Sequence, residues 1–182
     1  MRATPSQDDT AQNVVFNALP VGGGILGLSA LPGRGGDYRG DMEHLASWTP
    51  ALVISLVTEV ELLEAGAGDL GQRIQDKGTR WAHLPIRDAG APDAAFQEAW
   101  PEVSTRARRA LLGGGRVLIH CRGGCGRSGM VSLRLMIEAG EAPDEALERL
   151  RGVRACAIET DAQMRWAMAA ERQPAVFVRH SR

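Results

Sequence analysis

The sequence has 182 residues, of which 44% are hydrophobic and 24% charged, and its formal net charge is −1. These values are typical of one globular domain with a sizeable core, and they exclude a global electrostatic field that would recruit nucleic acid or an anionic membrane. We therefore expect a single domain over residues 1–182, with a polar N-terminal extension at about 1–12 and a C-terminal tail at about 173–182. Any anionic ligand must be held by local charges and dipoles.

Targeting signals and a disulfide framework are not expected. The N-terminal segment MRATPSQDDT contains no apolar stretch of signal-peptide length, and no run approaches the roughly 18 apolar residues of a membrane span. The cysteines are three, Cys121, Cys125 and Cys156, an odd number that favours a reactive thiol or packed side chains over disulfides. We predict a cytoplasmic protein in which Cys156 is an ordinary packed residue.

The first half of the chain contains candidate strands and short helices. ALVISLV (51–57) is a continuous apolar run of strand length, typical of a strand buried on both faces. The other candidate strands lie at 14–18, 25–28 and 81–86. Thr58-x-x-Glu61 and Asp69-x-x-Gln72 have the pattern of helix N-caps.

The second half alternates helices with one more strand. Asp93 is the expected N-cap of a long helix that bends at Pro101 and ends before three glycines. The segments are a helix at 94–112, a strand at 116–120, a buried helix at 128–139, and helices at 143–153 and 160–171. This alternation predicts an α/β fold with a mainly parallel central sheet flanked by helices.

The decapeptide HCRGGCGRSG (120–129) lies between the strand at 116–120 and the helix that follows. Ligands of open α/β sheets bind at the carboxyl ends of the strands, which is where this decapeptide lies. Its glycines allow successive N–H groups to turn inward, and the helix N-terminus adds a positive dipole, so the loop is an expected anion site. The expected phosphate-binding residues are Arg122, Gly123, Gly124, Cys125, Gly126 and Arg127.

Cys121 is the expected nucleophile at the floor of this loop. A helix N-terminus and nearby cations lower the pKa of a thiol and increase the thiolate that reacts. We expect Arg127 to bind two phosphate oxygens with its planar guanidinium, Ser128 to donate to the thiolate, and His120 to help order the loop. Each feature alone favours a structural role, such as a small buried cysteine or a turn glycine. Their occurrence in this order between a strand and a helix favours catalysis.

The sequence resembles the cysteine-dependent protein tyrosine phosphatase superfamily, because HCRGGCGRS matches the signature H-C-x5-R-[S/T]. HCRGGCGRSG looks especially like the loops of dual-specificity phosphatases related to the cyclin-dependent-kinase-associated phosphatase. The resemblance extends beyond the loop, because four further segments fall in the order expected of that group: PGRGGDYRGDMEHL, ALVISLV, HLPIRDAGAPD and AIETDAQMRW. The resemblance implies a phosphoric monoester hydrolase that forms a cysteinyl-phosphate without a cofactor or metal. The implied substrate is a protein or peptide with phosphotyrosine or with phosphoserine or phosphothreonine.

The resemblance also implies a general acid, and Asp88 in LPIRDAGAPD occupies its place. Asp93 is the competing carboxylate and is better explained as a helix cap. Related enzymes often have a water-orienting glutamine where this chain has Glu159, which we expect to point away from a phosphate, and whether Gln163 replaces that glutamine stays open. Cys125 has two interpretations: a small side chain that fits the loop, or, less favoured, a partner for a disulfide with Cys121.

Three alternative functions remain. A phosphoinositide phosphatase is less favoured, because the loops of such enzymes usually have two lysines where this chain has Arg122 and Cys125. A rhodanese-type sulfurtransferase has a shorter loop, and a non-catalytic phosphate-binding module would not need a nucleophile and an acid together. Outside the loop we expect structural roles for two histidines and four tryptophans, and a solvated face for three arginines: His44, His83, Trp48, Trp81, Trp100, Trp166, Arg106, Arg108 and Arg109.

Overall fold

A computed structural model describes residues 13–176, and its centre is a five-stranded sheet. The strands are β1 (Asn17–Val21), β2 (Gly24–Ser29), β3 (Leu52–Ser55), β4 (Arg80–His83) and β5 (Arg116–His120). Their order is β1-β2-β5-β3-β4, and only the β1–β2 pair is antiparallel. The prediction of an α/β fold with a mainly parallel sheet is confirmed, and β5 lies at the centre of the sheet.

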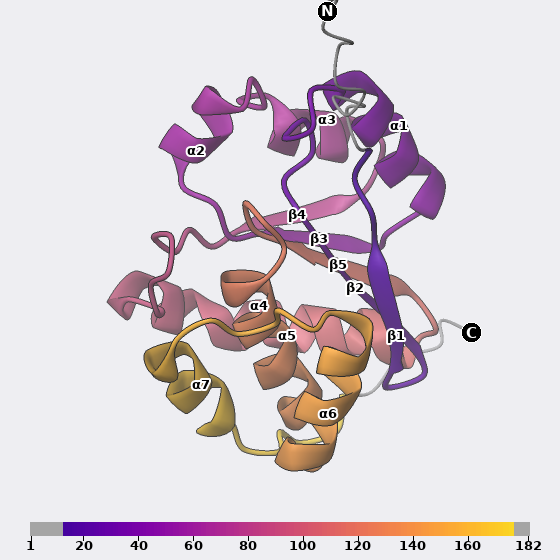
Figure 1. The fold of residues 1–182 in the computed structure, drawn as a ribbon. Coiled ribbons are helices and arrows are strands. Elements are labelled where there is room, and N and C mark those ends of the chain that lie inside the picture. The colour runs from indigo at the N-terminus through magenta and orange to yellow at the C-terminus, as the bar shows by residue number, and fades with distance from the viewer. Residues whose placement is uncertain (1–12, 177–182) are drawn as a thin grey trace, which may run out of the picture.

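Seven helices of the described residues cover both faces of this sheet (Figure 1). They are α1 (Tyr38–Trp48), α2 (Glu59–Glu64), α3 (Leu70–Asp76), α4 (Ala94–Leu112), α5 (Gly126–Glu138), α6 (Pro143–Val153) and α7 (Asp161–Met168). Figure 1 shows α1, α2 and α3 above the sheet and α4 to α7 below it.

Alternate residues of the central strands enter two separate hydrophobic cores. In β3, Leu52 and Ile54 join the core that contains α4 and α5, whereas Val53 joins the core under α1 and α3. In β5, Val117 and Ile119 face the first core and Leu118 the second. Because successive strand residues point to opposite faces, strands covered on both sides must be apolar at every position, as the sequence indicated.

The predicted helix starts are largely confirmed. The Thr58 side chain accepts from the Glu61 amide while the Glu61 carboxylate accepts from the Thr58 amide, and Asp93 accepts from the Phe96 amide at 2.8 Å. Thr160 caps α7 through the amide of Gln163. Asp69 differs: it precedes α3 without capping it, because its carboxylate accepts from Arg73 and Tyr38 instead.

Several boundaries differ from the prediction. The sequence analysis did not predict α1, β1 starts later than expected, β4 ends at His83, and α7 ends at Met168. Arg108 is not solvated: it is buried on α4 and donates to Ser104 and to the carbonyl of Pro174, because the chain after α7 folds back over that face. Residues 1–12 of the expected extension and 177–182 of the tail lie outside the described residues.

The cysteine prediction was wrong, because Cys125 and Cys156 form a disulfide and only Cys121 is a free thiol. Cys156 is exposed in the loop between α6 and α7, and that loop lies against the start of α5. The fold brings together two cysteines 31 positions apart, and spacing alone does not indicate this pair.

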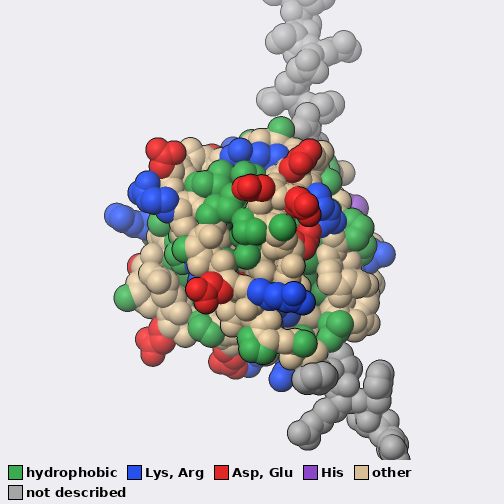
Figure 2. All heavy atoms as spheres, turned by 90° about the horizontal axis from the view of Figure 1, so that it is seen from below, with side chains coloured by type: hydrophobic (Ala, Val, Ile, Leu, Met, Phe, Trp, Pro, Cys, Tyr) green, Lys and Arg blue, Asp and Glu red, His purple; other side chains and the backbone are tan. Residues whose placement is uncertain are grey.

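The surface has no dominant charge sign in the view from below. Figure 2 shows acidic and basic side chains interspersed over this face, in agreement with a net charge of −1. Within residues 13–176, no helix has both the length and the apolar character needed to cross a membrane.

Gly129 lets the α6–α7 loop pack directly on α5, and this contact can be tested. A Cβ at Gly129 would lie 2.6 Å from the Ile158 nitrogen, so Gly129→Ala must displace backbone. We expect it to lower the free energy of unfolding by about 1–3 kcal/mol in urea denaturation. The control is Gly152→Ala in α6, where a Cβ meets no atom within 4 Å. This substitution should raise the free energy of unfolding by up to about 1 kcal/mol, because alanine favours a helix more than glycine does. Equal effects of the two substitutions would contradict this packing.

Candidate active site

The loop from Cys121 to Arg127, called the phosphate loop from here on, connects β5 with α5 (Figure 1). It begins at the carboxyl end of the central strand, and its last two residues form the first turn of α5. Cys121 is 2% exposed, and its Sγ lies 3.3 Å from Ser128 Oγ. The structure therefore brings the predicted nucleophile and the predicted hydroxyl together at the floor of the loop.

Four successive carbonyl oxygens of the phosphate loop, from Arg122 to Cys125, accept hydrogen bonds from groups outside it. Arg122 O accepts from the Leu31 amide at 3.1 Å and from Arg34 Nη1 at 3.2 Å. Gly123 O and Gly124 O each accept from the Arg154 guanidinium at 3.0 Å. The fourth carbonyl oxygen, Cys125 O, accepts from the amides of Gly129 and Ile158.

The amides of the same loop have the opposite arrangement. Within the described residues, no backbone N–H from Arg122 to Ser128 donates a hydrogen bond to another residue. A trans peptide is planar, with its C=O and N–H pointing in opposite directions, so carbonyls held outside turn the next amides inward. Buried amides without a partner are rare, and a row of them around a thiol is an anion site.

Glycine is required at position 124 for two reasons. Gly124 has φ +73°, a left-handed conformation that strains other residues, and a Cβ there would lie 2.7 Å from the Ser29 carbonyl carbon. The loop consequently packs directly on the end of β2. The prediction that glycines shape this loop agrees with its geometry.

Arg127 is 2% exposed and forms a two-point ion pair that the sequence analysis did not predict. Its Nη1 and Nη2 donate to the two carboxylate oxygens of Glu61, each at 2.8 Å, and Nη1 also donates to Ile86 O at 2.8 Å. No hydrogen bond within residues 13–176 uses Nε. The guanidinium edge formed by Nε and Nη2 can therefore bind two oxygens of a phosphate.

The Arg127–Glu61 pair keeps both groups charged. Burial alone would lower the pKa of Arg127, but the hydrogen bonds and charge of Glu61 raise it above its ordinary value. Burial alone would raise the pKa of Glu61, but the hydrogen bonds from Arg127 and Thr58 lower it. Only the capping role of Glu61 was visible in the sequence, because its partner is 66 positions away.

Asp88 lies at the rim of the site in the loop after β4. Its carboxylate is 67% exposed and stands 3.5 Å from Arg127 Nη2. Ala89, the next residue, has φ +55° and donates its amide to the same carboxylate. Asp88 thus reaches the group that would bind phosphate, whereas Asp93 is used in capping α4.

His120 is fully buried behind the nucleophile in a chain of hydrogen bonds. Trp81 Nε1 donates to Ser55 Oγ at 2.8 Å, and Ser55 Oγ lies 2.5 Å from His120 Nε2. Cys121 O lies 3.4 Å from His120 Nδ1 and can only accept, so this contact assigns the proton of the neutral ring to Nδ1, and Nε2 accepts from the Ser55 hydroxyl. Burial, together with the charges of His83 and Arg127, lowers the pKa of His120 to about 4. His120 is a neutral support for the loop.

Glu159 and Gln163 both lie beside the phosphate loop. A Cβ built on Gly126 would be 3.0 Å from the Glu159 carboxylate and 3.0 Å from Gln163 Oε1, so both side chains lie next to the phosphate loop. The expectation that Glu159 points away from a phosphate stays a prediction. Gln163 is buried, accepts from the amides of Glu159 and Thr160, and donates to Gly90 O in the Asp88 loop. Both ends of its amide are engaged, so its role is to connect the Asp88 loop with α7.

Two further predicted residues have positions that were not foreseen. Arg122 is exposed, its carbonyl oxygen is held by Leu31 and Arg34, and its side chain makes no hydrogen bond or ion pair within residues 13–176. Cys125 is bonded to Cys156, so the hypothesis of a disulfide between Cys125 and Cys121 is not supported. The outer arginines Arg34 and Arg154 were also missed, because neither is adjacent to the loop in sequence.

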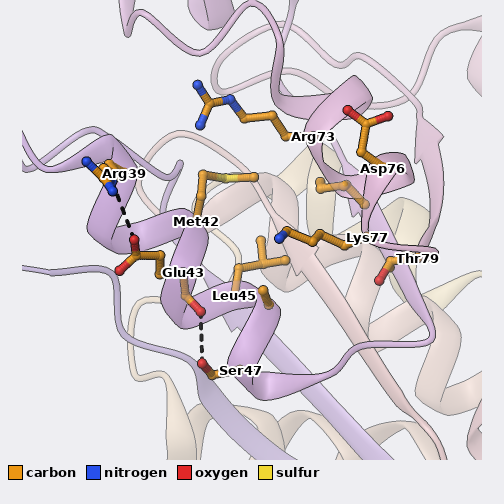
Figure 3. Close-up of a pocket in the computed structure, with 11 residues that line it drawn as sticks. Arg39, Met42, Glu43, Leu45, Ser47, Arg73, Asp76, Lys77 and Thr79 are labelled. Carbon is orange, nitrogen blue, oxygen red and sulfur yellow. Dashed lines mark hydrogen bonds and ion pairs between the residues drawn. The ribbon is translucent and has the colours of Figure 1, made fainter.

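Among the described residues, the site contains no metal-binding cluster, and it is separate from a cavity between α1 and α3. Among residues 13–176, no three His, Cys, Asp or Glu side chains are grouped to hold a metal ion. A cavity of about 600 Å³ lies between α1 and α3, where Lys77 extends toward α1 and Arg39 pairs with Glu43 (Figure 3). Its lining includes no residue of the phosphate loop.

The buried neutral state of His120 predicts acid lability. The unfolded chain protonates histidine near pH 6.5, whereas folded His120 does so only near 4, so the free energy of unfolding should fall as pH drops from 6.5 to 4. The shift corresponds to roughly 3 kcal/mol at pH 4. His120→Asn should remove most of this slope in urea titrations, and the exposed-histidine control His44→Asn should keep it. An unchanged slope in His120→Asn would refute the assignment.

The sequence was compared with protein families and with known proteins. Residues 35–176 match the family described as "PTP-SAK: Swiss Army Knife protein, DSP-PTPase phosphatase domain". Cyclin-dependent kinase inhibitor 3 of Mus musculus is 35% identical over 136 residues, which cover 71% of this chain and 63% of that protein. The chain thus spans somewhat less than two thirds of that relative.

Two solved structures are similar in fold. Kinase associated phosphatase, crystallised with its catalytic-site cysteine replaced by serine, has a TM-score of 0.72 and 27% identity over 86% of this chain and 93% of that chain. PTPMT1 in complex with PI(5)P has a TM-score of 0.61 over 79% of this chain and 87% of that chain, and at 18% identity it shows the fold alone. With the family match over residues 35–176, these findings show that the chain belongs to the dual-specificity type of cysteine-dependent protein tyrosine phosphatases.

Proposed function

We propose that this chain is a protein phosphatase that hydrolyses phosphoric monoesters through a cysteinyl-phosphate on Cys121. The observation that carries the proposal is the row of amides from Arg122 to Ser128 around a buried thiol, which have no hydrogen-bond acceptor within residues 13–176. The amides and Arg127 bind the three non-bridging oxygens of the phosphate, whose charge they stabilise in the transition state. The substrate is a phosphorylated protein or peptide, supported by the likeness to kinase associated phosphatase.

In the first step, the Cys121 thiolate attacks phosphorus and the bond from phosphorus to the leaving oxygen breaks. Asp88 donates its proton to that oxygen, so a neutral alcohol or phenol leaves. The contact between Asp88 and Arg127 Nη2 supports this role, because it places the acid beside the bound phosphate. Ser128 Oγ, 3.3 Å from the sulfur, stabilises the thiolate when its hydroxyl donates.

In the second step, water attacks phosphorus and the P–S bond breaks, which regenerates the thiolate. Asp88, now a carboxylate, accepts the proton of the water. Glu159 is the candidate to orient this water, because its carboxylate lies beside Gly126 and the amide of Gln163 is engaged at both ends.

A phosphoinositide substrate is the alternative within the same fold. The phosphate loop has two basic side chains, Arg122 and Arg127, and Arg127 is paired with Glu61. No contact in the described residues favours a polyphosphorylated headgroup over a phosphoprotein. The cytoplasmic location expected from the sequence stays a prediction.

Hydrolysis of a small aryl phosphate tests the two chemical roles. Cys121→Ser should reduce turnover to background, since the nucleophile is lost. Asp88→Asn should lower kcat by about 10²–10⁴-fold, because the leaving oxygen receives no proton. The matched control is Asp93→Asn, which keeps both the helix cap and the activity.

The same assay separates the alternatives. Full activity in Cys121→Ser would exclude the cysteinyl-phosphate route, and full activity in Asp88→Asn would exclude only the acid. Hydrolysis of phosphoinositides in preference to phosphotyrosine and phosphothreonine peptides would favour the lipid substrate. Production of thiocyanate from thiosulfate and cyanide without phosphatase activity would favour a sulfurtransferase.

Glu159→Gln tests the carboxylate beside the loop. Removal of a negative charge near the bound anion should tighten inorganic phosphate binding, measured as an inhibition constant, by roughly fivefold. The control is Glu145→Gln, an exposed carboxylate in the first turn of α6. Unchanged or weaker phosphate binding in Glu159→Gln would show that this charge does not act on the anion.

A further inference from the structure

The segment Arg154–Glu159, called the outer segment from here on, follows α6 and runs along the outside of the phosphate loop. Its residues contact the loop in succession. Arg154 binds two carbonyls, Cys156 forms the disulfide with Cys125, the Ile158 amide donates to Cys125 O, and the Glu159 carboxylate lies beside Gly126. Positions 123 to 126 of the loop are thus all restrained from one side.

The contact of Arg154 has the most direct consequence for the anion site. Its Nε donates to Gly124 O and its Nη2 to Gly123 O, both at 3.0 Å. Because the peptide unit is planar, a carbonyl of Gly123 fixed outside directs the Gly124 N–H inward, and a carbonyl of Gly124 directs the N–H of Cys125 inward. One guanidinium therefore sets the direction of two amides in the middle of the loop.

These two positions need an external restraint more than their neighbours do. Gly123 and Gly124 have no side chains to limit their backbone angles, and glycine loses the most conformational freedom on folding. Arg122 O is already fixed by Leu31 and Arg34, and Cys125 O by α5. Without Arg154, no other hydrogen bond within the described residues would hold Gly123 O or Gly124 O to a donor outside the loop.

The outer segment itself is held in a strained conformation. Ile158 has φ +68°, which is unfavourable for a β-branched residue and costs on the order of 1–3 kcal/mol. Such a conformation persists only where the surroundings impose it. The surroundings that impose it on Ile158 are the Cys125–Cys156 disulfide and the close packing of residues 157 and 158 on Gly129.

We propose that Arg154 is a positioning residue for the phosphatase reaction, which orients the amides of Gly124 and Cys125 by holding the preceding carbonyls, and that the Cys125–Cys156 disulfide is a second restraint on the same loop. The inference rests on the proposed function. A planar guanidinium with two donors suits two successive carbonyls, whereas a lysine ammonium supplies the charge without the fork. The role therefore depends on geometry as well as on charge.

The test compares Arg154→Gln and Arg154→Lys with the exposed control Arg165→Gln on α7. Arg154→Gln should lower kcat for an aryl phosphate by about 10- to 100-fold and weaken vanadate binding, because the amides lose their alignment. Arg154→Lys should recover only a minor part of the lost kcat and of the lost vanadate affinity. The melting temperature should change little, and Arg165→Gln should match the wild type.

A second readout does not require turnover. The rate at which iodoacetamide alkylates Cys121, followed by mass spectrometry at neutral pH, should be lower in Arg154→Gln, and vanadate should protect the thiol less. Cys156→Ser alone should have a small effect while Arg154 remains. The double variant should lose more than the product of the single losses, since two restraints on one loop are coupled.

Three results would overturn the inference: an Arg154→Gln protein with wild-type vanadate binding and alkylation, an Arg154→Lys protein equal to the wild type, or a change confined to the KM of phosphopeptides. Failure of the proposed function looks different. In that case the wild type would not hydrolyse phosphate esters, whereas the alkylation and vanadate experiments would still report on Arg154.

Discussion

The planarity of the peptide bond is the constraint on which this active site depends. Four successive carbonyls of the phosphate loop are bound by groups outside it, and the following amides are consequently committed to the inside. The donors that hold these carbonyls come from the loop after β2, from the end of α6, from the α6–α7 loop and from α5 itself. The geometry of the phosphate loop is thus maintained by residues that lie outside it.

The second constraint is the burial of charge. Arg127 is almost inaccessible, and a buried guanidinium without partners would be strongly destabilising. Glu61 and Ile86 O supply those partners on one edge and leave the other edge for phosphate. Because Glu61 belongs to α2 and Ile86 precedes the Asp88 loop, the same guanidinium ties three distant segments together. The pair positions the site and also stabilises the fold.

The sequence predicted those parts of the site that are local in the chain. A buried strand, a glycine-rich loop and a buried helix follow one another at 116–139, so the positions of Cys121, Arg127 and Ser128 could be inferred from spacing alone. Asp93 was distinguished from Asp88 by the same kind of local signal, since a cap precedes its helix. The cap motif at Thr58 and Glu61 was also recognised, but the ion pair of Glu61 with Arg127 was not.

The missed features depend on contacts between distant segments. Glu61 reaches Arg127 across 66 positions, and Arg154 reaches the loop across about 30. The α1 helix was missed because PGRGGDYRGDMEHL is rich in glycine and charge, and its start is set by an Asp37 cap on Gly40. The disulfide was missed because an odd cysteine count without a secretion signal favours free thiols. The contacts of Glu61 and Arg154 and the disulfide carry no pattern within a short window, whereas the Asp37 cap of α1 is local.

The most direct test of the central claim is a titration of ¹⁵N-labelled Cys121→Ser protein with vanadate, followed by the backbone amide resonances. The structure predicts that the amides of residues 122–128 shift strongly and together, and that the amides of α1 and α3 around the separate cavity do not. Saturable vanadate binding that leaves the amides of 122–128 unshifted would contradict the account.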